Sequence, residues 1–65
     1  MLKLTHRKNG TVRTFPDDAL ADICLGMGGG GYTNAQTIKA MTIKASFEKN
    51  RTVRTFLYLL EEIKP

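Results

Sequence analysis

The chain has 65 residues, of which 42% are hydrophobic and 25% charged, and ten Lys and Arg against six Asp and Glu leave a net charge of +4. This length and composition exclude a two-domain enzyme, a Rossmann domain, a TIM barrel and a disordered chain, and indicate one small domain. No apolar run approaches the ~20 residues needed to cross a membrane. The N-terminus lacks the apolar segment of a secretory signal, and the single cysteine, Cys24, forms no internal disulfide, so we expect a cytoplasmic protein.

The basic residues are concentrated in two segments that share one sequence pattern. The pentapeptide TVRTF at 11–15 recurs at 52–56, and at the same offset of 41 eight of the fourteen residues in 2–15 are identical. Five of the six acidic residues follow these segments, in 17–22 and 61–62. The ungapped match predicts a single domain, 1–65, built from repeat units 2–25 and 42–64 with a glycine-rich connector, 26–31.

Residues 2–15 have the pattern of a β-hairpin whose loop is Lys8-Asn9-Gly10. A three-residue loop needs a type I turn followed by a left-handed residue, and Asn-Gly supplies both. In that register the apolar face carries Leu2, Leu4, His6, Val12 and Thr14. The opposite face carries Lys3, Thr5, Arg7, Thr11 and Arg13.

A helix is predicted after Thr14, a candidate N-cap, because Pro16 and two aspartates suit a first helical turn and the apolar residues of 19–27 follow helical spacing. Gly26 is a stop signal. The glycines of 26–31 formally satisfy G-x-G-x-x-G, but here the run follows a helix rather than a strand. A flexible connector is therefore the favoured interpretation, and an anion-binding nest is the alternative.

The next segment is ambiguous because Thr-Ile-Lys-Ala occurs at 37–40 and again at 42–45. A spacing of five would place the two isoleucines on opposite faces of one strand. A short helix over 34–40 followed by a strand from Met41 resolves this conflict, and a long bulged strand is the alternative.

Residues 42–55 repeat the pattern of the first hairpin. One face would carry Ile43, Ala45, Phe47, Val53 and Thr55. The other would carry Lys44, Ser46, Glu48, Thr52 and Arg54. Arg51 stands where Gly10 stands in the first unit, and a left-handed arginine costs on the order of 1 kcal/mol, so this turn is expected to be longer or differently shaped.

A second helix is predicted after Thr55, because the apolar residues that follow it have helical spacing: Phe56, Leu59, Leu60 and Ile63. The predicted fold is therefore α+β. It is a small single domain of two β-hairpins, with four antiparallel strands in pseudo-duplicated ββα units and helices packed on one face.

No group of residues predicts catalysis, a metal site or a cofactor site. One His and one Cys do not complete a tetrahedral metal site. Cys24 lies on an apolar helix face, where a buried, inert thiol is expected, and His6 is expected to be half-buried at the sheet margin. The helix dipole explains Asp17 and Asp18. We therefore expect a protein that is not an enzyme.

The segregated charge predicts a binding protein whose cationic hairpin face docks on nucleic acid. That face carries no predicted aromatic side chain, which disfavours base stacking and favours the backbone of duplex DNA or structured RNA. The predicted contacts, to nucleic acid or to another partner, are Lys3, Arg7, Lys8, Arg13, Lys44, Lys49, Arg51 and Arg54.

Three alternatives remain open. The basic face is an ordinary solvated sheet surface in the simplest of them. In the second, the protein is a protein-binding inhibitor or adaptor of the phage or mobile-element type, which binds an acidic surface of a host nuclease or defence complex. In the third, exposed hairpin edges pair in a homodimer, which is compatible with either binding function.

Overall fold

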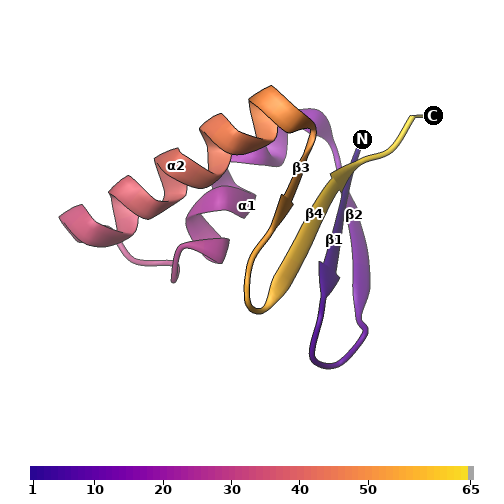
Figure 1. Cartoon of the computed structure of the whole chain (residues 1–65), viewed down its shortest axis with the longest axis horizontal. Coiled ribbons are helices and arrows are strands. Elements are labelled where there is room, and N and C mark those ends of the chain that lie inside the picture. Colours follow the sequence, from indigo (N-terminus) through magenta and orange to yellow (C-terminus); the bar gives the residue numbers. More distant parts are fainter. Residues whose placement is uncertain (65) are drawn as a thin grey trace.

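The computed structural model describes residues 1–64 and shows two β-hairpins separated in sequence by two helices (Figure 1). Its elements are β1 (Leu2–His6), β2 (Val12–Phe15), the 3-10 turn η1 (Asp17–Ala19), α1 (Leu20–Met27), α2 (Asn34–Asn50), β3 (Thr52–Arg54) and β4 (Tyr58–Glu62). The strands form one antiparallel sheet in the order β2-β1-β4-β3. The predicted α+β class with four antiparallel strands in two hairpins is confirmed.

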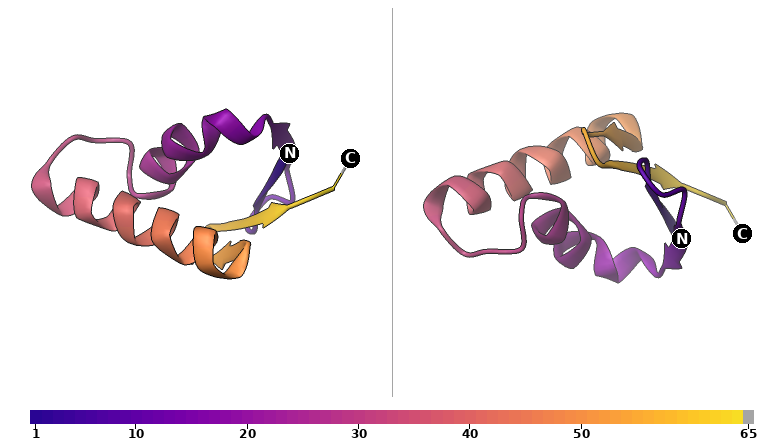
Figure 2. Two further views of the ribbon diagram at one scale, coloured as in Figure 1. Left: turned by 90° about the horizontal axis from the view of Figure 1, so that it is seen from above. Right: turned by 90° about the horizontal axis from the view of Figure 1, so that it is seen from below.

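Both helices lie on the same side of the sheet (Figure 2). The sheet contributes Leu2, Val53 and Leu60 to the core. The helices contribute Ile23, Cys24, Met27, Ile43 and Phe47. Each large apolar side chain buried here stabilises the fold by about 1.5–3 kcal/mol, so the sheet and the helical pair hold each other in place.

The first hairpin forms where it was predicted, but its register differs by one residue. Gly10 has the predicted left-handed conformation, with φ 76°. Its N–H donates to the His6 carbonyl (2.8 Å), and the His6 N–H donates to the Thr11 carbonyl (2.8 Å), so two residues oppose His6 in a β-bulge. The bulge pairs Leu4 with Arg13 and Thr5 with Val12. Val12 and Arg13 consequently exchange the faces predicted for them.

The predicted strand from Met41 is wrong, because the helix that begins at Asn34 continues to Asn50. Its start agrees with the prediction, and the Thr33 hydroxyl accepts a hydrogen bond from the Gln36 N–H (3.3 Å). Five residues turn a helix by about 140°, so the two isoleucines of the Thr-Ile-Lys-Ala repeat face different directions. Ile43 is buried and Ile38 is 64% exposed, which removes the conflict that had suggested a strand.

The predicted C-terminal helix is also wrong, because residues 58–62 form the central strand β4. This strand pairs with β1 on one side and with β3 on the other. A central strand is partly covered on both faces, so a short apolar run in it has no clear alternation and resembles a helix stripe. Unit 42–64 therefore contains a helix end and a hairpin, and it does not repeat the ββα order of 2–25.

The repeated pentapeptide nevertheless occupies equivalent kinds of position. In both copies its Thr-Val-Arg follows a left-handed residue, Gly10 or Arg51 (φ 59°), and its valine and arginine lie in an edge strand of the sheet. The two copies face opposite ways, because Val53 packs in the core whereas Val12 is 51% exposed. The predicted connector 26–31 begins later than expected, because Gly26 lies inside α1 and the helix ends at Met27.

Candidate functional site

The loops of both hairpins lie together at one end of the sheet, at the bottom of Figure 1, while the N-terminus lies at the other end. Six exposed residues on or beside these loops form what we call the hairpin-tip surface: Arg7, Lys8, Lys39, Arg54, Phe56 and Leu57. Arg7 and Lys8 belong to the first loop, and Phe56 and Leu57 form the second. Lys39 reaches this end from α2, where it borders a hollow shared with residues 55–58.

Arg7 fastens the two loops to each other. Its backbone N–H donates to the Leu57 carbonyl (2.7 Å). Its guanidinium donates to the carbonyl of Thr55 (2.6 Å) and, more weakly, to that of Phe56 (3.4 Å). These bonds join two segments that are distant in sequence, so the relative position of the loops is set by backbone contacts rather than by side-chain packing alone.

The second loop leaves a carbonyl available for Arg7. The Thr55 N–H donates to the Tyr58 carbonyl (2.8 Å), and the returning Tyr58 N–H donates to the Thr55 hydroxyl (3.1 Å) instead of to the Thr55 carbonyl. A threonine hydroxyl that accepts a backbone N–H in this way can cap a helix, and here the same kind of bond closes a hairpin. The freed carbonyl is the oxygen that the Arg7 guanidinium contacts.

Phe56 is the most exposed residue of the second loop, with 75% of its surface accessible. The Lys8 Nζ lies 4.3 Å from the centroid of its ring, a cation–π distance that links the first loop to the second once more. The prediction that Phe56 begins a helix is wrong. The aromatic side chain that seemed absent from the basic surface is therefore present, at its tip.

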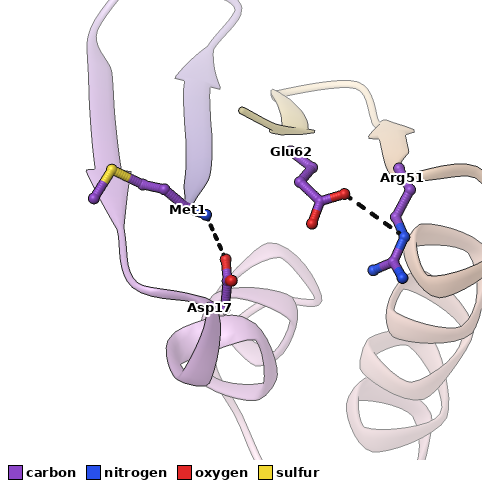
Figure 3. Close-up of polar contacts among 4 residues, drawn as sticks. All are labelled: Met1, Asp17, Arg51 and Glu62. Carbon is purple, nitrogen blue, oxygen red and sulfur yellow. Dashed lines mark ion pairs between the residues drawn. The ribbon is translucent and has the colours of Figure 1, made fainter. Parts of the chain in front are cut away.

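Charge is separated along the strands. Residues 4–14 and 53–59 contain four Lys and Arg and no Asp or Glu. The opposite end carries five of the six acids, namely Asp17, Asp18, Glu48, Glu61 and Glu62. Both ion pairs found within residues 1–64 lie at that opposite end (Figure 3). They join the Met1 amino group to Asp17 (2.6 Å) and Arg51 to Glu62 (3.6 Å).

The structure brings together only part of the predicted set of eight cations. Arg7, Lys8 and Arg54 meet at the hairpin-tip surface. Arg13 lies nearby on the helix-facing side of the sheet, with its guanidinium 5.6 Å from the Phe15 ring centroid. The other four lie elsewhere: Lys3 beside Glu61 on the outer face, Lys44 and Lys49 on α2, and Arg51 paired with Glu62.

The prediction that one face of the sheet is cationic is therefore wrong. The face that the helices leave open carries Val12, Thr5, Leu59 and Arg54 in one row across the strands. The neighbouring row carries Thr14, Lys3, Glu61 and Thr52. Two cations and one anion make this face nearly neutral, and it is the tip that concentrates positive charge.

Sequence reasoning missed Lys39, Phe56 and Leu57 as members of this surface. The two loop residues follow the repeated Thr-Val-Arg-Thr, so a hairpin loop there could have been inferred by treating the second copy as a strand that enters a turn. Lys39 carries no such signal, because its place at the tip depends on how α2 crosses the sheet.

Outside the hairpin-tip surface, a cleft, a histidine and a thiol are the further candidates for a site within residues 1–64. A cleft of about 360 Å³ separates α1 from the sheet, but its lining is largely apolar, with Leu4, Phe15, Ile23, Met27 and Tyr58 prominent. Among the described side chains no three His, Cys, Asp or Glu groups lie together as metal ligands. His6 is half-buried and packs edge-on against Tyr58, with ring centroids 5.1 Å apart. Burial raises the pKa of the Cys24 thiol above its ordinary value of 9.0.

Comparisons with protein-family models, with curated proteins and with solved structures found no match for this chain. Across residues 1–64, neither helix combines the length and the apolar character required to cross a bilayer. The function is therefore inferred from the hairpin-tip surface itself.

Proposed function

We propose that this protein is a non-catalytic binding protein whose hairpin-tip surface docks on the phosphate backbone of nucleic acid. The observation that carries the proposal is the accumulation of cations at one end of the sheet, without an acidic residue in either loop or in the adjoining strand ends. Cations gathered in this way repel one another, and a polyanion relieves that repulsion while releasing its own counterions.

The geometry of the loops supports the same proposal. Arg7 anchors the two loops through backbone carbonyls, so the cations are presented from a fixed base. Its guanidinium has five N–H donors, which leaves donors free to contact a phosphate oxygen while the bond to Thr55 is kept. Lys8, in the first loop, and Arg54, at the end of β3, are both exposed.

The test is a titration of a labelled DNA duplex at several salt concentrations, with two double variants of equal charge. K8Q/R54Q removes two cations from the hairpin-tip surface, and K44Q/K49Q removes two from α2. Each lost phosphate contact should reduce the slope of log affinity against log salt by about 0.9 on duplex DNA, so K8Q/R54Q should lose up to about 1.8. K44Q/K49Q should retain the wild-type slope.

Two results would contradict the proposal. One is the absence of any mobility shift, with the duplex and with single-stranded oligonucleotides alike, at low salt and micromolar protein. The other is an equal loss of slope in both double variants, because binding would then depend on net charge and not on the hairpin-tip surface.

Exposed apolar side chains favour a second candidate function, the binding of an acidic protein surface as an inhibitor or adaptor. Tyr32, Ile38 and Met41 are exposed on the helical part of the chain, and Lys39 and Lys44 lie on the same helix as the last two. A stoichiometric protein partner that survives nuclease treatment and is lost from I38S/M41S would support this function. Loss of all co-purifying material on nuclease treatment would count against it.

A further inference from the structure

We infer that Phe56 is a stacking platform for an unpaired base, so that the ligand of the hairpin-tip surface is single-stranded nucleic acid. This inference rests on the proposed function and specifies its ligand class. It reverses the sequence-based expectation of duplex binding, which depended on the absence of an aromatic side chain from the basic surface.

The phenyl ring of Phe56 is exposed to solvent. Phe15, Phe47 and Tyr58 pack in or against the core, whereas Phe56 remains 75% exposed at the apex of a two-residue loop. An exposed phenyl ring does not contribute to the core, and the loop closes through the backbone and hydroxyl of Thr55 without using the ring. Base faces are apolar and stack on such rings without regard to base identity.

Hydrogen bonds hold the loop that carries the ring in place. The Thr55 and Tyr58 hydrogen bonds fix the loop from within, and the Arg7 guanidinium holds the carbonyls of Thr55 and Phe56 from the neighbouring hairpin. Little backbone freedom is therefore lost when a ligand binds, which favours affinity.

Cations lie beside the ring of Phe56. The Lys8 ammonium lies 4.3 Å from the ring centroid, and Arg7 and Arg54 come from the adjoining loop and strand. A base on the ring and phosphates on these cations would use both kinds of group at once, as in proteins that bind single strands through aromatic side chains in a basic groove. In a duplex the base faces are covered, and exposing one requires that the base be unpaired and unstacked first. The surface therefore favours a strand whose bases are already unpaired.

The experiment measures fluorescence anisotropy of end-labelled oligonucleotides of about 12 nucleotides, long enough to span one small binding domain. Single-stranded DNA, single-stranded RNA and the DNA duplex are titrated at one salt concentration with the full chain. We expect tighter binding to at least one single strand than to the duplex. F56A should weaken that binding by about 5- to 150-fold, the range that corresponds to loss of one stacked base.

Matched variants separate stacking from other effects. F56Y keeps an aromatic ring and should retain most of the affinity, whereas F56L keeps apolar bulk and should resemble F56A. Y32A removes the other strongly exposed aromatic side chain, which lies between the two helices and outside both hairpin loops, and should bind as the wild type does. The salt slope of F56A should equal that of the wild type, because no charge is lost, and circular dichroism should show the same folded state.

The outcomes distinguish failure of the inference from failure of the proposed function. No binding to any of the three oligonucleotides would overturn both. Binding that depends on Lys8 and Arg54 but is unchanged in F56A, or is at least as tight for the duplex, would overturn the stacking platform and leave the phosphate-docking function standing.

Discussion

Replacing Arg7 with lysine tests whether the clamp between the hairpins depends on the shape of the guanidinium or only on its charge. R7K keeps the charge, but the lysine Nζ lies one bond closer to the backbone than Nη1, the single guanidinium nitrogen that contacts both loop carbonyls. A hydrogen bond to a charged group contributes about 1.5–3 kcal/mol. Because Arg7 is exposed, we expect a loss of about 1 kcal/mol in the free energy of unfolding. For a domain of this size that loss lowers Tm by about 4–8 °C.

The assay is thermal unfolding followed by circular dichroism, with R54K as the matched control. Arg54 undergoes the same exchange beside the same loop, but its side chain donates no hydrogen bond within residues 1–64, so its Tm should remain close to that of the wild type. Equal Tm values for R7K and the wild type would refute the clamp. R7K should also weaken oligonucleotide binding more than R54K does, since the loop that carries Phe56 loses its anchor.

Three further changes test the core, the helix end and the buried thiol. F47A removes a fully buried ring at a cost of about 3–5 kcal/mol, which equals the whole stability expected of so small a domain. Circular dichroism should therefore show an unfolded chain. A folded F47A would show that the core is not centred on Phe47. R51G should be more stable than R51A by about 1 kcal/mol in urea unfolding, because both lose the ion pair to Glu62 and only glycine relieves the left-handed backbone. Equal stabilities would mean that the positive φ costs nothing. Cys24 should react with a thiol reagent at pH 8 only after denaturant is added, and rapid labelling of the folded protein would contradict its burial. Because folding raises the pKa of the Cys24 thiol, the free energy of unfolding should fall as the pH rises above 9.0.

The sequence predicts elements well where a local signal agrees with the surroundings. Asn9 and Gly10 specify a hairpin turn, and the Asn9 side chain accepts a hydrogen bond from the Thr11 N–H (2.9 Å) as such a turn requires. Thr33 and Gln36 have the spacing of a capping box, and α2 begins beside them. Cys24 is buried as its helical spacing indicated.

Residues 42–64 show where local signals fail. Residues 43–47 alternate as a strand would, yet Ile43 and Phe47 also have helical spacing, and packing against the sheet selects the helix. Leu59 and Leu60 satisfy a helix stripe, yet pairing with β1 on one side and β3 on the other selects a strand. In both cases the deciding contacts are long-range, and the similarity between the two segments of the chain could not reveal them.

The sequence indicated a cluster of cationic side chains, but it did not indicate where on the fold they gather. Cationic side chains do gather, and Arg7, Lys8 and Arg54 belong to the predicted set. A bulge of one residue was enough to turn Arg13 toward the helices, and the helical conformation of 42–50 removed Lys44 and Lys49 from the sheet. The position of a side chain on a sheet depends on register, and one residue of slip changes its face.

The order of the strands in the sheet has a consequence for how the chain folds. β1 and β4 are the first and last strands in the sequence, yet they are neighbours at the middle of the sheet. Their ladder brings together segments that both helices and both outer strands separate, so it has a high contact order and forms at a large cost in chain entropy. During synthesis the sheet remains divided until residues 58–62 have left the ribosome. Deleting β1 or β4 would divide the sheet into two parts, whereas deleting β2 or β3 would remove only an edge strand.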